Sequence, residues 1–102
     1  FVPVRKAGKL PVPTIGIDYA LEYGVSRLEI DPTLIAGGER IIIVDDLIAT
    51  GGTALAAAQL LRQAGAVVDR ALFVIDLPDL GGADLLRANG IEVEALMAFA
   101  GD

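Results

Sequence analysis

The side chains best suited to chemistry lie between residues 41 and 53, which read IIIVDDLIATGGT. Four branched apolar residues predict a buried strand, and Asp45 and Asp46 follow where that strand is expected to end. Two glycines flanked by threonines come next, before an alanine- and leucine-rich stretch that predicts a helix closed by Gly65. A glycine turn at a helix N-terminus leaves backbone N–H groups unpaired at the positive end of the helix dipole. This turn is therefore predicted to bind an anion such as a phosphate.

The two acids cannot hold the same anion, because like charges repel. Asp45 and Asp46 are expected either to accept hydrogen bonds from hydroxyl groups beside the anion or to hold a cation through water. A phosphate beside a diol is the arrangement found in a 5-phosphoribosyl group. The segment lacks both the Walker pattern GxxxxGK and the dinucleotide fingerprint GxGxxG, so neither of those phosphate sites is predicted.

Composition limits the classes of protein that remain. The chain has 102 residues, enough for one domain, and 54% of them are apolar. A net charge of −6 with no basic run argues against nucleic acid or anionic membrane as a partner. The absence of histidine and cysteine excludes Ser-His-Asp and Cys-His catalysis and nearly all zinc sites. No apolar run is long enough to span a bilayer and no signal peptide opens the sequence, so we interpret the protein as cytoplasmic.

The surrounding pattern predicts an α/β fold. From residue 40 onward, strands and helices alternate with short loops, which is typical of a parallel sheet with right-handed crossovers. Residues 14–30 alternate apolar and polar side chains around Tyr23 and Gly24, which favours an antiparallel hairpin. The remaining expected elements are a short strand at 1–5, strands at 67–75 and 91–99, a helix at 83–89, and a loop at 76–82 that contains Asp76, Asp79, Gly81 and Gly82. Asp79 is interpreted as a helix cap.

The segment VDDLIATGGT at 44–53 resembles the 5-phosphoribosyl 1-pyrophosphate motif of type I phosphoribosyltransferases. The resemblance implies a parallel sheet with flanking helices in flavodoxin-like order, plus a flap hairpin. Residues 1–102 would then be a partial phosphoribosyltransferase core, with 14–31 as a flexible flap. In that family the acids hold the ribose hydroxyls and the following turn holds the 5′-phosphate. The substrate-binding residues implied here are Asp45, Asp46, Leu47, Ala49, Thr50, Gly51, Gly52 and Thr53.

Two further segments resemble the adenine phosphoribosyltransferases, one branch of this family: VRKAGKLP at 4–11 and LEYG at 21–24. The resemblance implies transfer of a 5-phosphoribosyl group from 5-phosphoribosyl 1-pyrophosphate to adenine, giving AMP and pyrophosphate. It also implies a homodimer and a Mg²⁺ ion held mainly by substrate and water, with no protein metal ligand.

The basic loop and the flap tip acquire roles only through this resemblance. On their own, Arg5, Lys6 and Lys9 would be interpreted as a solvated loop; the resemblance implies contact with pyrophosphate. Arg5 is the strongest candidate, because a guanidinium binds phosphate bidentately. Glu22 would take or relay the purine N9 proton, and Tyr23 would contact substrate beside it. Ser26 and Arg27 are interpreted as plain surface of the flap.

Alternative functions stay open at this point. A regulatory module could keep the same pocket to sense phosphoribosyl nucleotides without turnover, and a phosphoribosyltransferase could use another base. The sequence begins at Phe1 without a lead-in, which we interpret as a piece of a longer protein lacking a base hood and a first core strand. The loss of that strand predicts a gap in the sheet beside Ile41–Val44. We therefore expect the 102-residue chain alone to be inactive.

Overall fold

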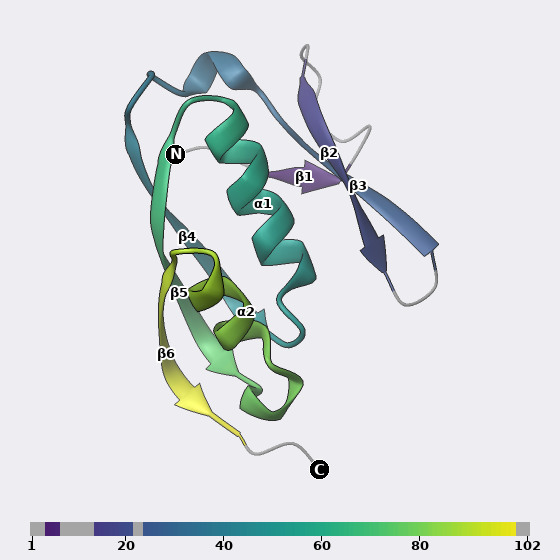
Figure 1. Ribbon diagram of the computed structural model, residues 1–102, viewed down its shortest axis with the longest axis vertical. Helices are drawn as coiled ribbons and strands as arrows, with labels where there is room; N and C mark the ends of the chain where they lie inside the picture. The colour runs from purple at the N-terminus through teal and green to yellow at the C-terminus, as the bar shows by residue number, and fades with distance from the viewer. Residues whose placement is uncertain (1–3, 7–13, 22–23, 100–102) are drawn as a thin grey trace.

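The computed structural model describes residues 4–6, 14–21 and 24–99. They form two small sheets and two helices (Figure 1). The strands are β1 (Arg5–Lys6), β2 (Ile15–Leu21), β3 (Gly24–Ile30), β4 (Arg40–Ile48), β5 (Val67–Asp76) and β6 (Glu92–Ala98), and the helices are α1 (Gly52–Gln63) and α2 (Gly82–Ala88). Two short 3-10 turns, η1 (Pro32–Leu34) and η2 (Pro78–Leu80), join them.

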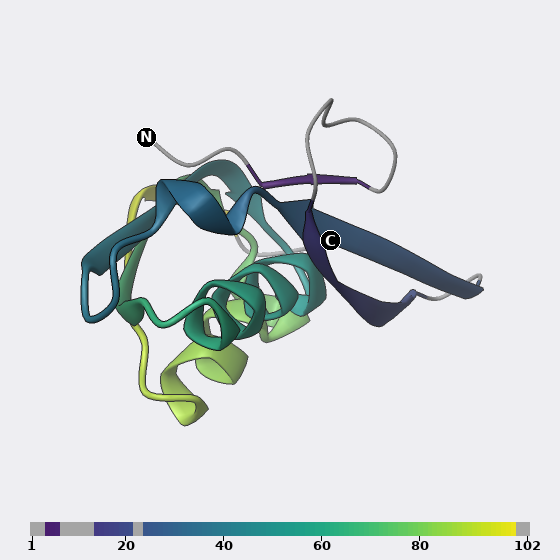
Figure 2. The same cartoon turned by 90° about the horizontal axis from the view of Figure 1, so that it is seen from above.

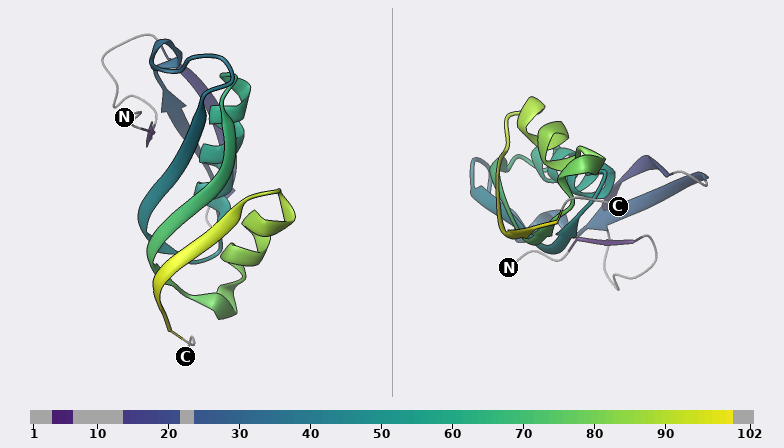
Figure 3. Two further views of the ribbon diagram at one scale, coloured as in Figure 1. Left: turned by 90° about the vertical axis from the view of Figure 1, so that its left-hand side faces the viewer. Right: turned by 90° about the horizontal axis from the view of Figure 1, so that it is seen from below.

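The second half of the chain forms a parallel sheet in the order β4-β5-β6. β4 and β5 are each followed by a helix and then by the neighbouring strand, and two right-handed crossovers in the same direction place both helices on one face. Figure 3 shows α1 and α2 together on that face of the sheet. The parallel sheet, its helices and the alternation expected after residue 40 are confirmed, and all three strand ends meet at the carboxyl edge where the turn lies.

Strand β4 runs further than the sequence pattern predicts. The strand was expected to end at Val44, but β4 continues to Ile48, which is paired with Asp76 of β5. The backbone N–H of Leu77 donates to the Ile48 carbonyl at 3.0 Å and extends this pairing by one bond. The expected boundary was wrong because β5 supplies ladder partners beyond the branched residues. Asp45 and Asp46 therefore lie within the last part of a strand.

The antiparallel hairpin is confirmed. β2 pairs with β3 from Ile15 opposite Ile30 to Leu21 opposite Gly24, and β1 adds to the other side of β3. A short strand was expected at 1–5. Among the described residues only Arg5 and Lys6 form β1, and residues 1–3 lie outside the described part of the chain. Figure 2 shows the hairpin projecting sideways from the helical layer.

The core lies where α1 meets the parallel sheet, α2 and the base of the hairpin. Leu60 of α1, Leu86 of α2 and Ile30 of β3 are each completely buried. The alanines of α1 at 56–58 are buried too, and their small side chains let neighbouring elements approach closely. The hairpin is therefore fixed to α1 at its base, while Val25 near its tip is 73% exposed.

Two surfaces of the parallel sheet stay open in the described part of the chain. No described strand pairs with the outer edge of β4, and a groove of about 600 Å³ runs along that edge between β4, α1 and Leu28. The face opposite the helices is also uncovered, with Val44 73% and Leu96 82% exposed. Among the described helices, none has the length and apolar character needed to cross a membrane.

Candidate functional site

The turn between β4 and α1 presents a set of free backbone donors. β4 ends at Ile48 and α1 begins at Gly52, so three residues make the connection. The backbone N–H groups of Thr50, Gly51, Gly52 and Thr53 donate no hydrogen bond to any residue that the structure describes. Gly51 caps the helix without a side-chain hydrogen bond. Free amides at the positive end of a twelve-residue helix favour an anion.

Only glycine fits at position 51. Its φ of +85° lies in the left-handed region that other residues avoid. A Cβ atom there would also lie 2.8 Å from the Cα of Gly82 and 2.9 Å from its carbonyl oxygen. The turn is therefore packed backbone against backbone on the loop that follows β5.

The acid pair lies in the last part of β4, two residues before the strand ends at Ile48. Asp45 and Asp46 are exposed, and adjacent residues of a strand point to opposite faces. Asp45 borders the groove beside β4 together with Thr53 and Ala54 at the start of α1. One oxygen of Asp45 accepts the backbone N–H of Asp46 at 2.8 Å, which helps to orient the carboxylate. Its remaining lone pairs are available to hydroxyl donors.

The other predicted residues of this segment surround the turn. Thr50 and Thr53 are exposed, so their hydroxyls can add donors to those of the backbone. Leu47 is 45% exposed on the last part of β4. The carbonyl of Ala49 accepts a hydrogen bond from the N–H of Gly82 at 3.0 Å. The structure thus places Asp45 and Thr53 on the same groove, whereas Asp46 is on the opposite face of β4.

The basic loop and the flap tip fall largely outside the described residues. Lys9, Glu22 and Tyr23 lie outside them entirely. Arg5 and Lys6 are described only in their backbone, which pairs in β1 with Glu29 and Leu28 of β3. Their roles therefore stay predictions.

Arg27 lies exposed on the hairpin, as the sequence pattern predicts, but it also makes contacts that the pattern does not show. Its guanidinium forms an ion pair with Asp18 at 3.0 Å and a second with Glu29 at 3.5 Å. The hydrogen bond with Asp18, directly opposite on β2, raises the pKa of Arg27. The guanidinium also lies over Gly16, where a Cβ atom would come within 2.6 Å of it. These contacts join the two strands of the hairpin on its outer side.

The sequence did not predict two features of the loop after β5: the position of Asp79 and the approach of Gly82 to the turn. Asp79 was expected to cap a helix, but the N-cap of α2 is Gly81, which has no side-chain cap, and Asp79 lies in η2 instead. The approach of Gly82 to the turn was not predicted. The only sequence signal for it was a pair of glycines following a second strand end, and that signal also fits an ordinary loop.

The described residues offer no preformed metal centre. No group of three or more carboxylate, histidine or cysteine side chains lies together in the part of the chain that the structure describes.

Comparison with known proteins matches residues 7–82 to the model of the phosphoribosyl transferase domain family. The chain belongs to this family. The match includes the acid pair, the turn between β4 and α1, and α1 itself, and it ends at Gly82. Membership in the family confirms the resemblance that the motif at 44–53 suggested.

Individual relatives and solved structures agree with this assignment. The adenine phosphoribosyltransferase of Novosphingobium aromaticivorans is 74% identical over 101 residues, which are 99% of this chain and 57% of that protein. The crystal structure of the Rhodothermus marinus adenine phosphoribosyltransferase superposes with a TM-score of 0.90 at 43% identity, covering 97% of this chain and 56% of that one. The Saccharomyces cerevisiae enzyme, complexed with an imino-altritol bisphosphate and adenine, gives 0.86 at 45% identity, covering 94% and 53%. The chain thus spans little more than half the length of these relatives.

Proposed function

We propose that this chain forms the phosphoribosyl-binding core of an enzyme that transfers the 5-phosphoribosyl group of 5-phosphoribosyl 1-pyrophosphate to adenine, giving AMP and pyrophosphate. The observation that carries the proposal is the set of free amides at 50–53, which begins four residues after two exposed carboxylates. Such a site offers donors to a phosphate and acceptors to neighbouring hydroxyls. The choice of adenine is supported by the names of the similar proteins.

In this proposal the turn at 49–53 holds the 5′-phosphate, and Asp45 and Asp46 accept hydrogen bonds from the ribose hydroxyls, beside Leu47. Cleavage at the anomeric carbon builds positive charge on the sugar, as in glycoside cleavage. A rigid grip on the phosphate and the diol positions that carbon for attack. Positioning and electrostatics therefore supply the catalysis, which suits a chain without histidine.

The leaving pyrophosphate requires cations. We assign Arg5, Lys6 and Lys9 to it, since they carry three of the eight basic residues of the chain. Mg²⁺ would neutralise pyrophosphate while bound mainly to substrate oxygens and water.

The hairpin at 14–31 acts as a flap in this proposal, with Glu22 taking or relaying the N9 proton and Tyr23 contacting substrate. Leu28 and Ile30 are buried in the core, so we propose that only the part near the tip moves. A lid of this kind would exclude water from the reacting carbon. We further propose that residues 1–102 act as a partial core within a cytoplasmic homodimer, and that the chain alone binds ligand without forming AMP.

Isothermal titration calorimetry with ribose 5-phosphate tests the proposal directly. We expect the 102-residue chain to bind ribose 5-phosphate at least tenfold more tightly than ribose, since each charged hydrogen bond to the phosphate contributes about 1.5–3 kcal/mol. Asp45→Asn should lower the affinity for ribose 5-phosphate by about tenfold and leave the affinity for inorganic phosphate unchanged. The reason is that a carboxylate–hydroxyl hydrogen bond is stronger than an amide–hydroxyl hydrogen bond.

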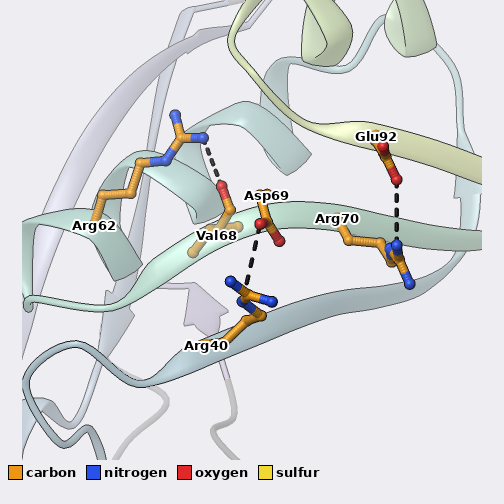
Figure 4. A network of polar contacts seen from close by, with 6 residues as sticks. All are labelled: Arg40, Arg62, Val68, Asp69, Arg70 and Glu92. Carbon is orange, nitrogen blue, oxygen red and sulfur yellow. Dashed lines mark hydrogen bonds and ion pairs between the residues drawn. The ribbon is translucent and has the colours of Figure 1, made fainter.

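Asp69→Asn is the matched control. Asp69 is an exposed acid at the other end of the sheet, 3.9 Å from Arg40, and its loss should leave both affinities unchanged (Figure 4). Equal affinity of the unmodified chain for ribose and ribose 5-phosphate would refute the assignment of the turn. Equal behaviour of the Asp45 and Asp69 variants would refute the role of the acid pair.

A further inference from the structure

Gly82 contacts the phosphate turn from a loop that is distant in sequence. It is the first residue of α2, it is buried, and its N–H donates to the carbonyl of Ala49 at 3.0 Å. The neighbouring N–H of Leu77 donates to the carbonyl of Ile48, also at 3.0 Å. The loop after β5 thus donates hydrogen bonds to the carbonyls of two consecutive residues, Ile48 and Ala49, where β4 ends and the turn begins.

The bond to Ala49 also sets the direction of a donor. The carbonyl of Ala49 and the N–H of Thr50 belong to one planar trans peptide group, in which they point in opposite directions. Because the carbonyl faces Gly82, the Thr50 N–H faces away from Gly82. That amide has no acceptor among the described residues, so it is available to an anion in the turn.

The contact leaves no room for a side chain at position 82. A Cβ atom there would overlap the carbonyl oxygen of Ala49 and lie 2.8 Å from the backbone nitrogen of Gly51. Both are backbone atoms of the turn, so neither can move by a simple rotamer change. Gly81 differs, because a Cβ atom there would meet nothing within 4 Å and only its φ of +79° opposes substitution.

We propose that Gly82 is a positioning residue for the phosphate turn: its missing side chain and its N–H fix residues 49–51 so that the Thr50 amide points at the 5′-phosphate. Any larger residue would displace the turn and weaken phosphate binding before it unfolds the domain. This inference rests on the proposed function, which supplies the ligand.

The test compares Gly82→Ala with Gly81→Ala and Gly37→Ala. Position 37 has an ordinary φ and open space around it, so Gly37→Ala controls for the glycine-to-alanine change itself. Titration of ribose 5-phosphate well below the unfolding temperature should show at least tenfold weaker binding for Gly82→Ala. Gly81→Ala should stay within threefold of the unmodified chain while its urea midpoint falls. Gly37→Ala should change neither quantity.

Each outcome has one meaning. Binding by Gly82→Ala within threefold of the unmodified chain would overturn the inference while leaving the proposed function intact. Equal weakening by Gly81→Ala and Gly82→Ala would also overturn it, because a general loop effect would then suffice. If the unmodified chain does not prefer ribose 5-phosphate to ribose, the proposed function fails and this inference fails with it.

A measurement on the unmodified chain covers the case in which Gly82→Ala does not fold. Hydrogen–deuterium exchange of the Gly82 amide reports the bond to Ala49 directly. Saturating ribose 5-phosphate should slow that exchange at least tenfold, because a filled turn holds the Ala49 carbonyl in place. The amide of Leu86 in the same helix serves as the reference. Exchange at Gly82 that ligand leaves unchanged would overturn the coupling between the two loops.

Discussion

Replacing Arg62 by alanine is expected to destabilise the chain by about 2 kcal/mol without weakening phosphate binding. Arg62 lies in the last turn of α1, and its Nη2 donates to the carbonyl of Val68 at 2.6 Å and to that of Asn89 at 3.0 Å. Figure 4 shows the bond to Val68 at the start of β5. One guanidinium thus connects the ends of α1 and α2 to the beginning of a central strand.

The magnitude follows from these two bonds. Hydrogen bonds to a charged group contribute about 1.5–3 kcal/mol each, or about 3–6 kcal/mol for two. Arg62 is only partly buried, so in the alanine variant water can hydrogen-bond to the two carbonyls and offset much of this loss. Alanine restores a few tenths of a kcal/mol in helix propensity. A net loss of about 2 kcal/mol lowers the unfolding temperature by roughly 8–16 °C in a domain of this size.

Urea unfolding followed by circular dichroism measures the change, with Arg70→Ala as the control. Arg70 forms an ion pair with Glu92 at 3.3 Å, and both side chains are largely exposed, so its loss should cost at most about 1 kcal/mol. Ribose 5-phosphate affinity should be unchanged in the Arg62 variant, because Arg62 lies ten residues after Gly52, which places it about 15 Å along α1 from the turn. A cost for Arg62→Ala no larger than for Arg70→Ala would refute the reasoning, as would a large loss of affinity in folded Arg62→Ala.

Three further predictions concern the turn, the hairpin and turnover. Gly51→Ala should cost about 2–4 kcal/mol in urea unfolding, from a left-handed φ and overlap with Gly82; a cost under about 1 kcal/mol contradicts this. Gly16→Ala should displace the Arg27 guanidinium and break its 3.0 Å pair with Asp18 in a crystal structure, with little change in urea midpoint; an unmoved guanidinium counts against the packing. The 102-residue chain should form no AMP from adenine and 5-phosphoribosyl 1-pyrophosphate, whereas the whole Novosphingobium aromaticivorans relative should form it in the same assay; turnover by the chain alone contradicts this.

Much of the fold was predictable because its signals are local. The branched run at 41–44, the alanine-rich helix before Gly65 and the alternation around Tyr23 each specify an element from its own residues. The end of β4 was placed too early, since the last pairs of a strand depend on its neighbour and not on its own propensity. Ile48 is held in β4 by its pairing with Asp76, and nothing in the residues around Ile48 shows that.

The candidate site divides in the same way. The sequence by itself determined the acid pair and the turn at 49–53, because those donors and acceptors follow one another along the chain. Only the tertiary structure decided how the turn is held. Gly82 donates to Ala49 because the loop after β5 docks on the turn. In the hairpin, likewise, the Arg27 guanidinium lies over Gly16 because of the register of the two strands. Contacts of this kind join residues distant in sequence, and their energies depend on distances of a few tenths of an ångström that no local pattern encodes.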